Sequence, residues 1–426
     1  MTIAVPHGVA PEPIVLVPRE AYPDPMTTDD PWGGCFPLDP AFRDNPYPGL
    51  ANLRARDPVN ETPVGFWRLL RHDDVVRLLR DVPTGVRTTD GRLPGVTEDD
   101  TPGPRLFMLQ QDPPNHTRLR KLVSHAFTPR SINALRPAID RIVTASLDRV
   151  AARGEMDLIA DLALPVPSTV ICEMMGVPLA DRESFTVWTA QATHGLATML
   201  NPPEVLARAQ AAAMSLADYF LNLIAERRSR LTDDLLSTLI RAEEGGDRLS
   251  SDELISQSIG LLIAGFETTI GLIGNGMRAL VQHPEQLDAL RAEPTLINSA
   301  VEDCLRFDGP IVLTIRVLHA DAEFGGKVLP QNAMVMAMLA SANRDPAVFP
   351  DPDRFDIRRT PNDHLAFGGS THFCLGAHLA RMEAQAAIGA LVQRFDRLEL
   401  VDEHVEWGPS LFRVPGCVPL RFRAHA

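Results

Sequence analysis

The chain has 426 residues, 45% of them hydrophobic, enough to build a sizeable core in one large domain or in two or three average ones. Its formal net charge of −14 argues against nucleic acid and against an anionic membrane as main partners. The five cysteines lack the close pairing of a metal site, and their odd number favours free thiols in a reducing compartment. The N-terminus lacks an apolar run of signal length, and no stretch reaches the roughly 18 uncharged apolar residues of a membrane span. We therefore expect a cytoplasmic protein without a membrane anchor.

The first part of the chain is expected to be mostly irregular. Residues 1–40 are predicted to form an extended, proline-rich arm, and nothing within residues 41–426 marks a further domain boundary. A strand is predicted at about residues 63–72, followed by a short helix at Asp73–Arg80. Residues 83–108 are rich in Gly, Pro, Thr and Asp, and a long loop of this kind in a compact domain is usually functional or disordered.

Helical patterns dominate residues 114–308, and short strands follow. Alternating apolar residues predict these strands at Ile311–His319 and Val328–Leu339. The helical stretch is interrupted at Pro165, at Pro178 and at Asn201-Pro202-Pro203.

A long central helix is predicted from Ser250 or Ser251, either of which is a good N-cap, to His283. It would extend over roughly 50 Å and is apolar nearly all round, so it should be buried. It contains Ala264-Gly265-Phe266-Glu267-Thr268-Thr269. A buried carboxylate beside a hydroxyl needs a reason, because burying an unpaired charge is costly. The structural alternative is a threonine bonded back to the carbonyl four residues earlier and a glutamate paired elsewhere.

A glycine-rich segment, Phe367-Gly368-Gly369-Ser370-Thr371-His372-Phe373-Cys374-Leu375-Gly376, precedes a second predicted helix. Its adjacent glycines allow a tight turn, and the apolar spacing from Leu375 to Leu391 is helical. Cys374 therefore lies at a helix N-terminus, where free amides and the helix dipole are expected to lower the thiol pKa. Such a thiolate suits a soft or redox metal. The alternative is a buried cysteine that acts as a small hydrophobic residue.

This decamer resembles the haem-binding loop of the cytochrome P-450 monooxygenases, whose pattern is Phe-Gly-x-Gly-x-(His/Arg)-x-Cys-x-Gly. It matches at every position but one, because Ser370 stands where the pattern has a glycine. Five motifs occur in family order over about residues 40–420. The resemblance implies the cytochrome P-450 fold, mainly α with a smaller β-sheet region. It also implies haem b (iron protoporphyrin IX), with Cys374 as the iron ligand and Phe367 and Gly376 beside the haem.

The central-helix segment is similar to the family's oxygen-activation motif, Ala/Gly-Gly-x-(Asp/Glu)-Thr. The resemblance implies that Ala264 and Gly265 lie at the haem and that Gly265 lets dioxygen approach the backbone. It makes Glu267 and Thr268 the catalytic pair: Thr268 would hydrogen-bond the dioxygen, and Glu267 would relay protons from solvent.

Two cationic residues follow Asp112-Pro113-Pro114, which we interpret as an N-cap with helix-start prolines. His116 and Arg120 are spaced i, i+4 and so share one helix face, which by itself would indicate an ordinary solvated basic face. The resemblance instead makes them haem propionate ligands, together with Arg316 and His372. Four cations around two carboxylates would form charge-assisted hydrogen bonds.

The sequence departs from the family's Glu-x-x-Arg pair, because Asp303 stands three residues before Arg306. The resemblance makes Arg354 the third member of this ion network. The adjacent Glu302 is spaced i, i+4 to Arg306, and we expect it to form a simple exposed pair, although the sequence leaves open which acid takes the family's role.

The resemblance implies a monomeric monooxygenase that hydroxylates or epoxidises a hydrophobic small molecule, such as a terpenoid, steroid, polyketide or fatty-acid-like compound. One oxygen atom of O2 would enter the substrate. Electrons would come from NAD(P)H through a ferredoxin reductase and a ferredoxin, because the chain has no flavin domain. Residues 83–108 and 195–204 are expected to form a lid. The residues expected to face the substrate are Leu261, Val312, Thr314, Leu411 and Phe412, besides the haem-side Ala264, Gly265 and Thr268.

Two other functions use the same cofactor. A peroxide-driven peroxygenase is disfavoured by Glu267 and Thr268, because such family members lack the acid–threonine pair. A non-catalytic haem-thiolate gas or redox sensor is disfavoured by the same proton-delivery residues.

Overall fold

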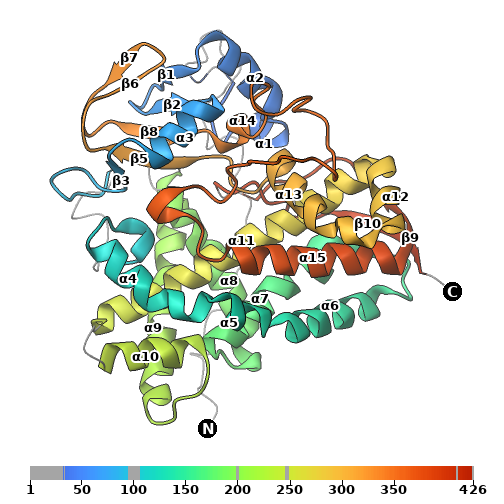
Figure 1. Ribbon diagram of the computed structural model, residues 1–426. Helices are drawn as coiled ribbons and strands as arrows, with labels where there is room; N and C mark the ends of the chain where they lie inside the picture. The colour runs from blue at the N-terminus through green and yellow to red at the C-terminus, as the bar shows by residue number, and fades with distance from the viewer. Residues whose placement is uncertain are drawn as a thin grey trace.

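The computed structural model describes residue 32 and residues 34–94, 106–197, 201–244, 249–408 and 411–424. Most of the expected N-terminal arm, and parts of both expected lid segments, lie outside these residues. The sheet-rich part of the molecule, with β1, β2, β5 and β8, gathers at one end beside the N-terminal helices, and the remaining helices form a layered body (Figure 1).

The centre of the helical body is α11 (Ser251–Gln282), which confirms the predicted central helix. Ser250 caps it, since its hydroxyl accepts from the Glu253 amide and the Glu253 carboxylate accepts from the Ser250 amide. The helix ends at His283, before Pro284. Among the described helices, α11 alone is long and apolar enough to cross a membrane, but 67% of its most apolar window is buried in the core.

Several helices pack on α11. Its neighbours include α7 (Pro165–Met175), α9 (Pro203–Arg228), α13 (Ile297–Asp308) and α15 (Ala377–Arg394). In Figure 1, α15 crosses in front of α11, with α6 beneath it. The other α-helices are α1 (Pro40–Asp44), α2 (Tyr47–Arg56), α3 (His72–Arg80), α4 (Asn115–Ser124), α5 (Pro129–Asn133), α6 (Arg136–Val150), α8 (Arg182–Thr193), α10 (Leu235–Glu244), α12 (Pro284–Ala292) and α14 (Leu339–Ala342).

The largest sheet has the strand order β1-β2-β8-β5-β3. Its pairs are antiparallel except β2 and β8, which are parallel. The predicted strand at 63–72 is thus reduced to β2, and the two predicted after residue 310 become shorter strands. The strands of this sheet and of the neighbouring hairpin are β1 (Val59–Glu61), β2 (Trp67–Leu69), β3 (Thr84–Gly85), β5 (Thr314–Leu318), β6 (Ala322–Phe324), β7 (Lys327–Leu329) and β8 (Met334–Ala337).

A three-stranded sheet was not expected from the sequence. It consists of β4 (Glu155–Asp157), β10 (Pro419–Ala424) and β9 (Phe395–Leu400), with β10 in the middle. β4 has only three residues and interrupts a helical stretch, and a period-2 pattern over three residues is too brief to detect. β9 and β10 have an ordinary length of six residues each, but the sequence does not show which strands they join.

Candidate active site

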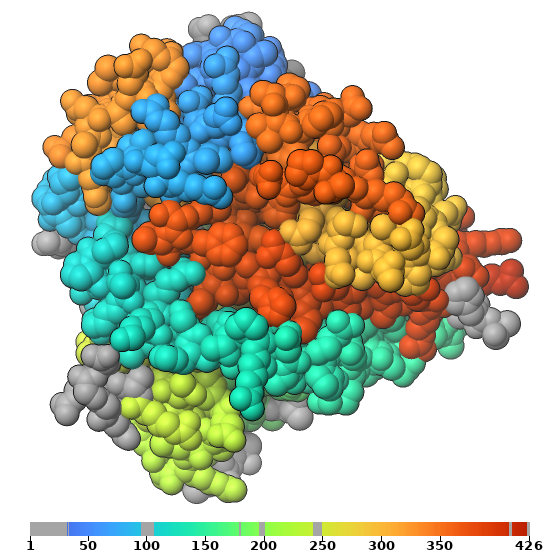
Figure 2. All heavy atoms as spheres, in the orientation of Figure 1, coloured from blue at the N-terminus to red at the C-terminus, as the bar shows by residue number. Residues whose placement is uncertain are grey.

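The glycine-rich loop before α15 is held by its backbone and by Arg120. The Cys374 amide donates to the Phe367 carbonyl at 3.0 Å. Arg120 on α4 donates from Nη1 to the Thr371 carbonyl at 3.0 Å and from Nη2 to the Phe373 carbonyl at 2.7 Å. The orange C-terminal third of the chain crosses the middle of the face in Figure 2, between the blue N-terminal and teal segments. Arg120 of α4 therefore holds the loop in place from a separate helix.

The loop has two residues in the left-handed region. Gly368 has φ +68° and Ser370 has φ +56°. A Cβ in this region crowds the backbone, which explains physically why the family pattern has glycine where this chain has Ser370.

Cys374 retains accessible surface, yet protein atoms around it desolvate the thiol. This burial raises the thiol pKa, and the Gly376 amide, Arg120 and Arg381 oppose it without reversing it. The prediction of a lowered pKa is therefore wrong for the protein by itself, because desolvation outweighs the helix start.

The oxygen-activation segment of α11 also keeps accessible surface. Ala264 is exposed although it lies in the middle of a buried helix. Thr268 donates from its hydroxyl to the Ala264 carbonyl at 3.0 Å, the i−4 bond of the structural alternative. Glu267 is half-buried. A Cβ on Gly265 would meet Ile171 Cδ1 at an ordinary 3.6 Å, so crowding does not explain the glycine.

A hydrogen bond from α11 to α15 brings these two segments together. The Thr269 hydroxyl, next to Thr268, bonds Glu383, which lies nine positions after Cys374. Glu383 is only 2% exposed, and burial raises the pKa of its carboxyl to about 8, with the Thr269 bond opposing the rise. Glu383 was not predicted from the sequence. The feature that could have identified it is a single acidic residue in a largely apolar helix.

The four predicted propionate ligands form one cationic cluster. The His116 and His372 rings lie 4.2 Å apart, and burial together with His372, Arg120 and Arg316 lowers the pKa of His116 to about 4. Burial also lowers the pKa of Arg316 to about 10. Its Nη1 donates only to neutral oxygens, the Thr314 hydroxyl at 3.1 Å and the Ile315 carbonyl at 2.8 Å.

These observations fit an anionic group bound between α4, β5 and the loop. His372 Nε2 is buried without a hydrogen-bond partner among the described residues, since the nearby Asp112 Oδ1 is 4.0 Å away. Buried Arg316 and half-buried Arg120 carry a permanent positive charge that needs negative charge beside it, whereas His116, with its lowered pKa, contributes a neutral imidazole at neutral pH. The paired carboxylates of a haem would supply that negative charge, so the residues present fit the group that the loop implies.

The sequence predicted Asp112 as the N-cap of α4, and this prediction is wrong. The N-cap is Pro114, and Asp112 instead accepts from the amides of Val86 at 2.9 Å and Arg87 at 3.0 Å. Burial would raise the pKa of Asp112, but His372 and the two amides outweigh it and lower the pKa. Asp112 therefore connects the turn after β3 to the cationic cluster.

Asp303 takes the position of the network acid and is fully buried. Its carboxylate accepts from Arg306 at 2.6 and 3.2 Å and from Arg359 Nε at 3.2 Å. Arg354 was expected as the third member, but its side chain is exposed and only its carbonyl joins, accepting from Arg306 at 2.9 Å. The third member of the network is thus Arg359, five residues beyond Arg354.

Glu302 does not form a simple exposed pair. It is half-buried and accepts from Arg381 at 2.7 and 2.8 Å, with His364 Nε2 at 3.1 Å. Burial would raise the pKa of Glu302, but Arg381 and His364 outweigh it and lower the pKa to about 2. The expectation of an exposed pair with Arg306 was wrong because the partner lies on α15, far along the chain.

The predicted substrate-facing residues lie in several parts of the structure. Leu261 and Val312 are buried in separate apolar clusters. Thr314 supports Arg316 through its hydroxyl. Leu411 packs against the cluster of Trp32, Phe36 and Leu38, and Phe412 packs against the main core. Their contact with a substrate remains a prediction.

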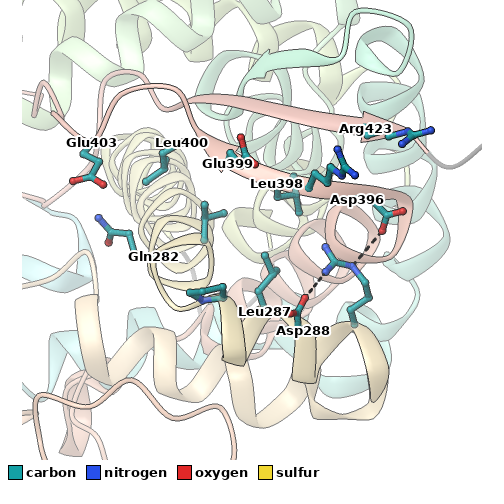
Figure 3. Close-up of a pocket in the computed structure, with 13 residues that line it drawn as sticks. Gln282, Leu287, Asp288, Asp396, Leu398, Glu399, Leu400, Glu403 and Arg423 are labelled. Carbon is teal, nitrogen blue, oxygen red and sulfur yellow. Dashed lines mark hydrogen bonds and ion pairs between the residues drawn. The ribbon is translucent and has the colours of Figure 1, made fainter.

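A groove lies at the far end of α11 and is not part of this site (Figure 3). Charged and polar side chains line much of it, among them Gln282, Asp288, Asp396, Glu403 and Arg423. Gln282 is about 20 Å along α11 from Thr268. The groove is therefore remote from the residues of the candidate active site.

The family model described as Cytochrome P450 matches residues 86–407. The chain belongs to the cytochrome P450 family. It is 41% identical over 393 residues to the cytochrome P450 monooxygenase PikC of Streptomyces venezuelae, covering 90% of this chain and 92% of that protein. It is 42% identical over 365 residues to the vitamin D(3) 25-hydroxylase of Pseudonocardia autotrophica, covering 84% and 88%.

Solved structures agree with this P450 assignment. The crystal structure of P450BioI in complex with hexadec-9Z-enoic acid ligated acyl carrier protein has a TM-score of 0.83 and 38% identity, and the match covers 90% of this chain and 99% of that chain. The mainly α P450 fold is thereby confirmed. This P450 is an oxidoreductase, a monooxygenase whose family implies a haem cofactor, a redox partner and a hydrophobic substrate.

Proposed function

We propose that this P450 binds haem b through the Cys374 thiolate and inserts one oxygen atom of O2 into a hydrophobic small molecule. The observation that carries the proposal is the cationic cluster of His116, Arg120, Arg316 and His372 beside the loop that presents Cys374. When bound, the haem supplies the reduction and cleavage of O2. The protein supplies the thiolate, the charges that hold the cofactor, and the protons.

The cationic cluster is proposed to hold the two propionates by charge-assisted hydrogen bonds. Arg316 and His372 are suited to this role, because one guanidinium lacks a carboxylate partner at hydrogen-bonding distance and one imidazole nitrogen lacks any described partner. Arg120 has a second role, since it also bonds the loop carbonyls before Cys374.

Glu267 and Thr268 are proposed to deliver protons. Glu267 is half-buried on α11 and would take protons from solvent through its carboxylate. Thr268 donates to the Ala264 carbonyl, which leaves the lone pairs on its Oγ1 free to accept a hydrogen bond from the solvent side. To hydrogen-bond dioxygen, the hydroxyl would turn from that carbonyl toward the ligand.

We further propose a terpenoid, steroid, polyketide or fatty-acid-like substrate. This is supported by the apolar character of Leu261, Val312, Leu411 and Phe412 and by the range of relatives, among them a vitamin D(3) 25-hydroxylase, a 6-deoxyerythronolide B hydroxylase and a protein crystallised with an acyl-carrier-protein-bound fatty acid. Electrons would come from NAD(P)H through a ferredoxin reductase and a ferredoxin to a monomeric cytoplasmic enzyme.

The test is the spectrum of the reduced protein with carbon monoxide. A thiolate-ligated haem gives a red-shifted Soret band, and Cys374→His should abolish it. Cys417→Ser is a matched control, because Cys374 and Cys417 are the two exposed cysteines of the five. Retention of the band in Cys374→His, or its loss in Cys417→Ser alone, would falsify the assignment.

A further inference from the structure

Two adjacent acids on α13 belong to separate networks. Asp303 points into the core, where it binds Arg306 and Arg359. Glu302 binds Arg381 of α15 through two hydrogen bonds, at 2.7 and 2.8 Å. One residue of separation on a helix turns side chains about 100° apart, so the two networks are separate. The Glu302 network therefore needs its own explanation.

Arg381 lies on α15 close to Cys374. Its guanidinium carbon lies 4.4 Å from the centre of the Phe367 ring, within cation–π distance. The Phe367 carbonyl in turn accepts the Cys374 amide at 3.0 Å. Arg381 thus contacts the loop that carries the sulfur and brings a positive charge to it.

Glu302 holds Arg381 in this position. Its carboxylate binds the guanidinium edge with Nε and Nη2, a two-bond geometry that fixes both the place and the plane of the group. His364 supports the same carboxylate at 3.1 Å, and its Nδ1 accepts the amide of Ala366 at 3.2 Å, next to Phe367. Glu302 is thereby connected to the start of the loop in two ways: through Arg381, which contacts the Phe367 ring, and through His364, which accepts the Ala366 amide.

We infer that Glu302 and Arg381 form a charge pair that sets the electrostatic potential at the Cys374 sulfur, with Glu302 as the positioning residue for Arg381. The inference rests on the proposed ligation of haem by Cys374. Reduction of the iron centre adds negative charge, so a nearby cation favours the reduced form and a nearby anion opposes it. The pair would then adjust the midpoint potential of the haem from outside its direct ligands.

The experiment is a spectroelectrochemical titration of the haem-loaded enzyme and its variants. Glu302→Gln keeps the shape of the side chain and removes its charge, which leaves Arg381 uncompensated, so the midpoint potential should rise. Arg381→Met removes the cation, and the potential should fall. Arg381→Lys keeps the charge and should restore most of the wild-type value. Glu293→Gln, which removes one charge from the exposed pair with Arg358, is the control and should give no shift.

A purely structural role predicts a different result. Loss of a brace would lower haem content or thermal stability in both variants and move the potential in one direction, or not at all. Shifts of the same sign in Glu302→Gln and Arg381→Met, or no shift in either, would overturn the inference. The carbon monoxide spectrum of the wild-type protein is read separately: without a thiolate-type band the proposed ligation itself fails, whereas a normal band with unshifted potentials removes only the charge-pair inference.

Discussion

The buried carboxyl of Glu383 predicts that its own contribution to the stability of the enzyme falls as the pH rises from 5 to 8. Its pKa is about 8 in the folded protein, against an ordinary value of 4.5. Between these values the folded state keeps a proton that the unfolded state has released. The contribution of Glu383 to the free energy of unfolding therefore decreases with rising pH over this window and levels off above it.

The magnitude follows from the same two values. At 1.36 kcal/mol per pKa unit, the raised pKa of Glu383 lowers the free energy of unfolding by roughly 3 kcal/mol at pH 7 and by under about 1 kcal/mol at pH 5. Glu383→Gln carries no titrating group, so its stability relative to wild type should improve by about 2 kcal/mol between these pH values. A constant offset from the new amide beside Thr269 does not affect this difference.

Chemical unfolding at several pH values checks the prediction, with haem loss followed in parallel. Exposed Glu285→Gln is the matched control and should follow the wild-type curve at every pH. A difference between Glu383→Gln and wild type that does not change from pH 5 to pH 8 would refute the reasoning, as would a wild type that gains stability relative to the variant as the pH rises.

Three further predictions use the same site. Ser370→Gly should raise the free energy of unfolding by about 1 kcal/mol, since it removes a Cβ from a left-handed backbone position; an unchanged or lowered denaturation midpoint contradicts this. Asp303→Ala should cost about 3–5 kcal/mol and lower haem content, because it leaves Arg306 buried without its carboxylate. Glu302→Ala should cost less, about 2 kcal/mol, because its bonds to Arg381 are only half-buried; the reverse order in thermal unfolding would show that Glu302 is the more important acid. Thr268→Ala should retain substrate binding but yield less product and more peroxide per NAD(P)H consumed, and unchanged coupling would remove Thr268 from proton delivery.

Local patterns predicted much of the fold. The caps and apolar spacing of α11 predicted its bounds within a residue, and the Cys374 loop predicted the start of α15. The three-stranded sheet was missed because β4 has only three residues and because its partner strands come from distant parts of the chain.

The candidate site was predictable where one motif carries the chemistry and unpredictable where partners meet across the fold. Glu302 was paired with the wrong arginine because spacing on one helix says nothing about Arg381 on another. The shift of the Cys374 thiol pKa was predicted in the wrong direction for a similar reason. The helix start is visible in the sequence, but the packing that desolvates the sulfur is not.

The position of β10 in its sheet has a consequence for biosynthesis. It is the middle strand, so β4 and β9 meet only through it. The Val418 amide reaches back across 261 residues to the Asp157 carboxylate beside β4. At ordinary translation rates, β4 then waits on the order of tens of seconds on the ribosome with its edge unpaired. During that time the nascent chain exposes a strand edge to other chains, so a ribosome slowed between β4 and β10 should increase aggregation more than one slowed before β4.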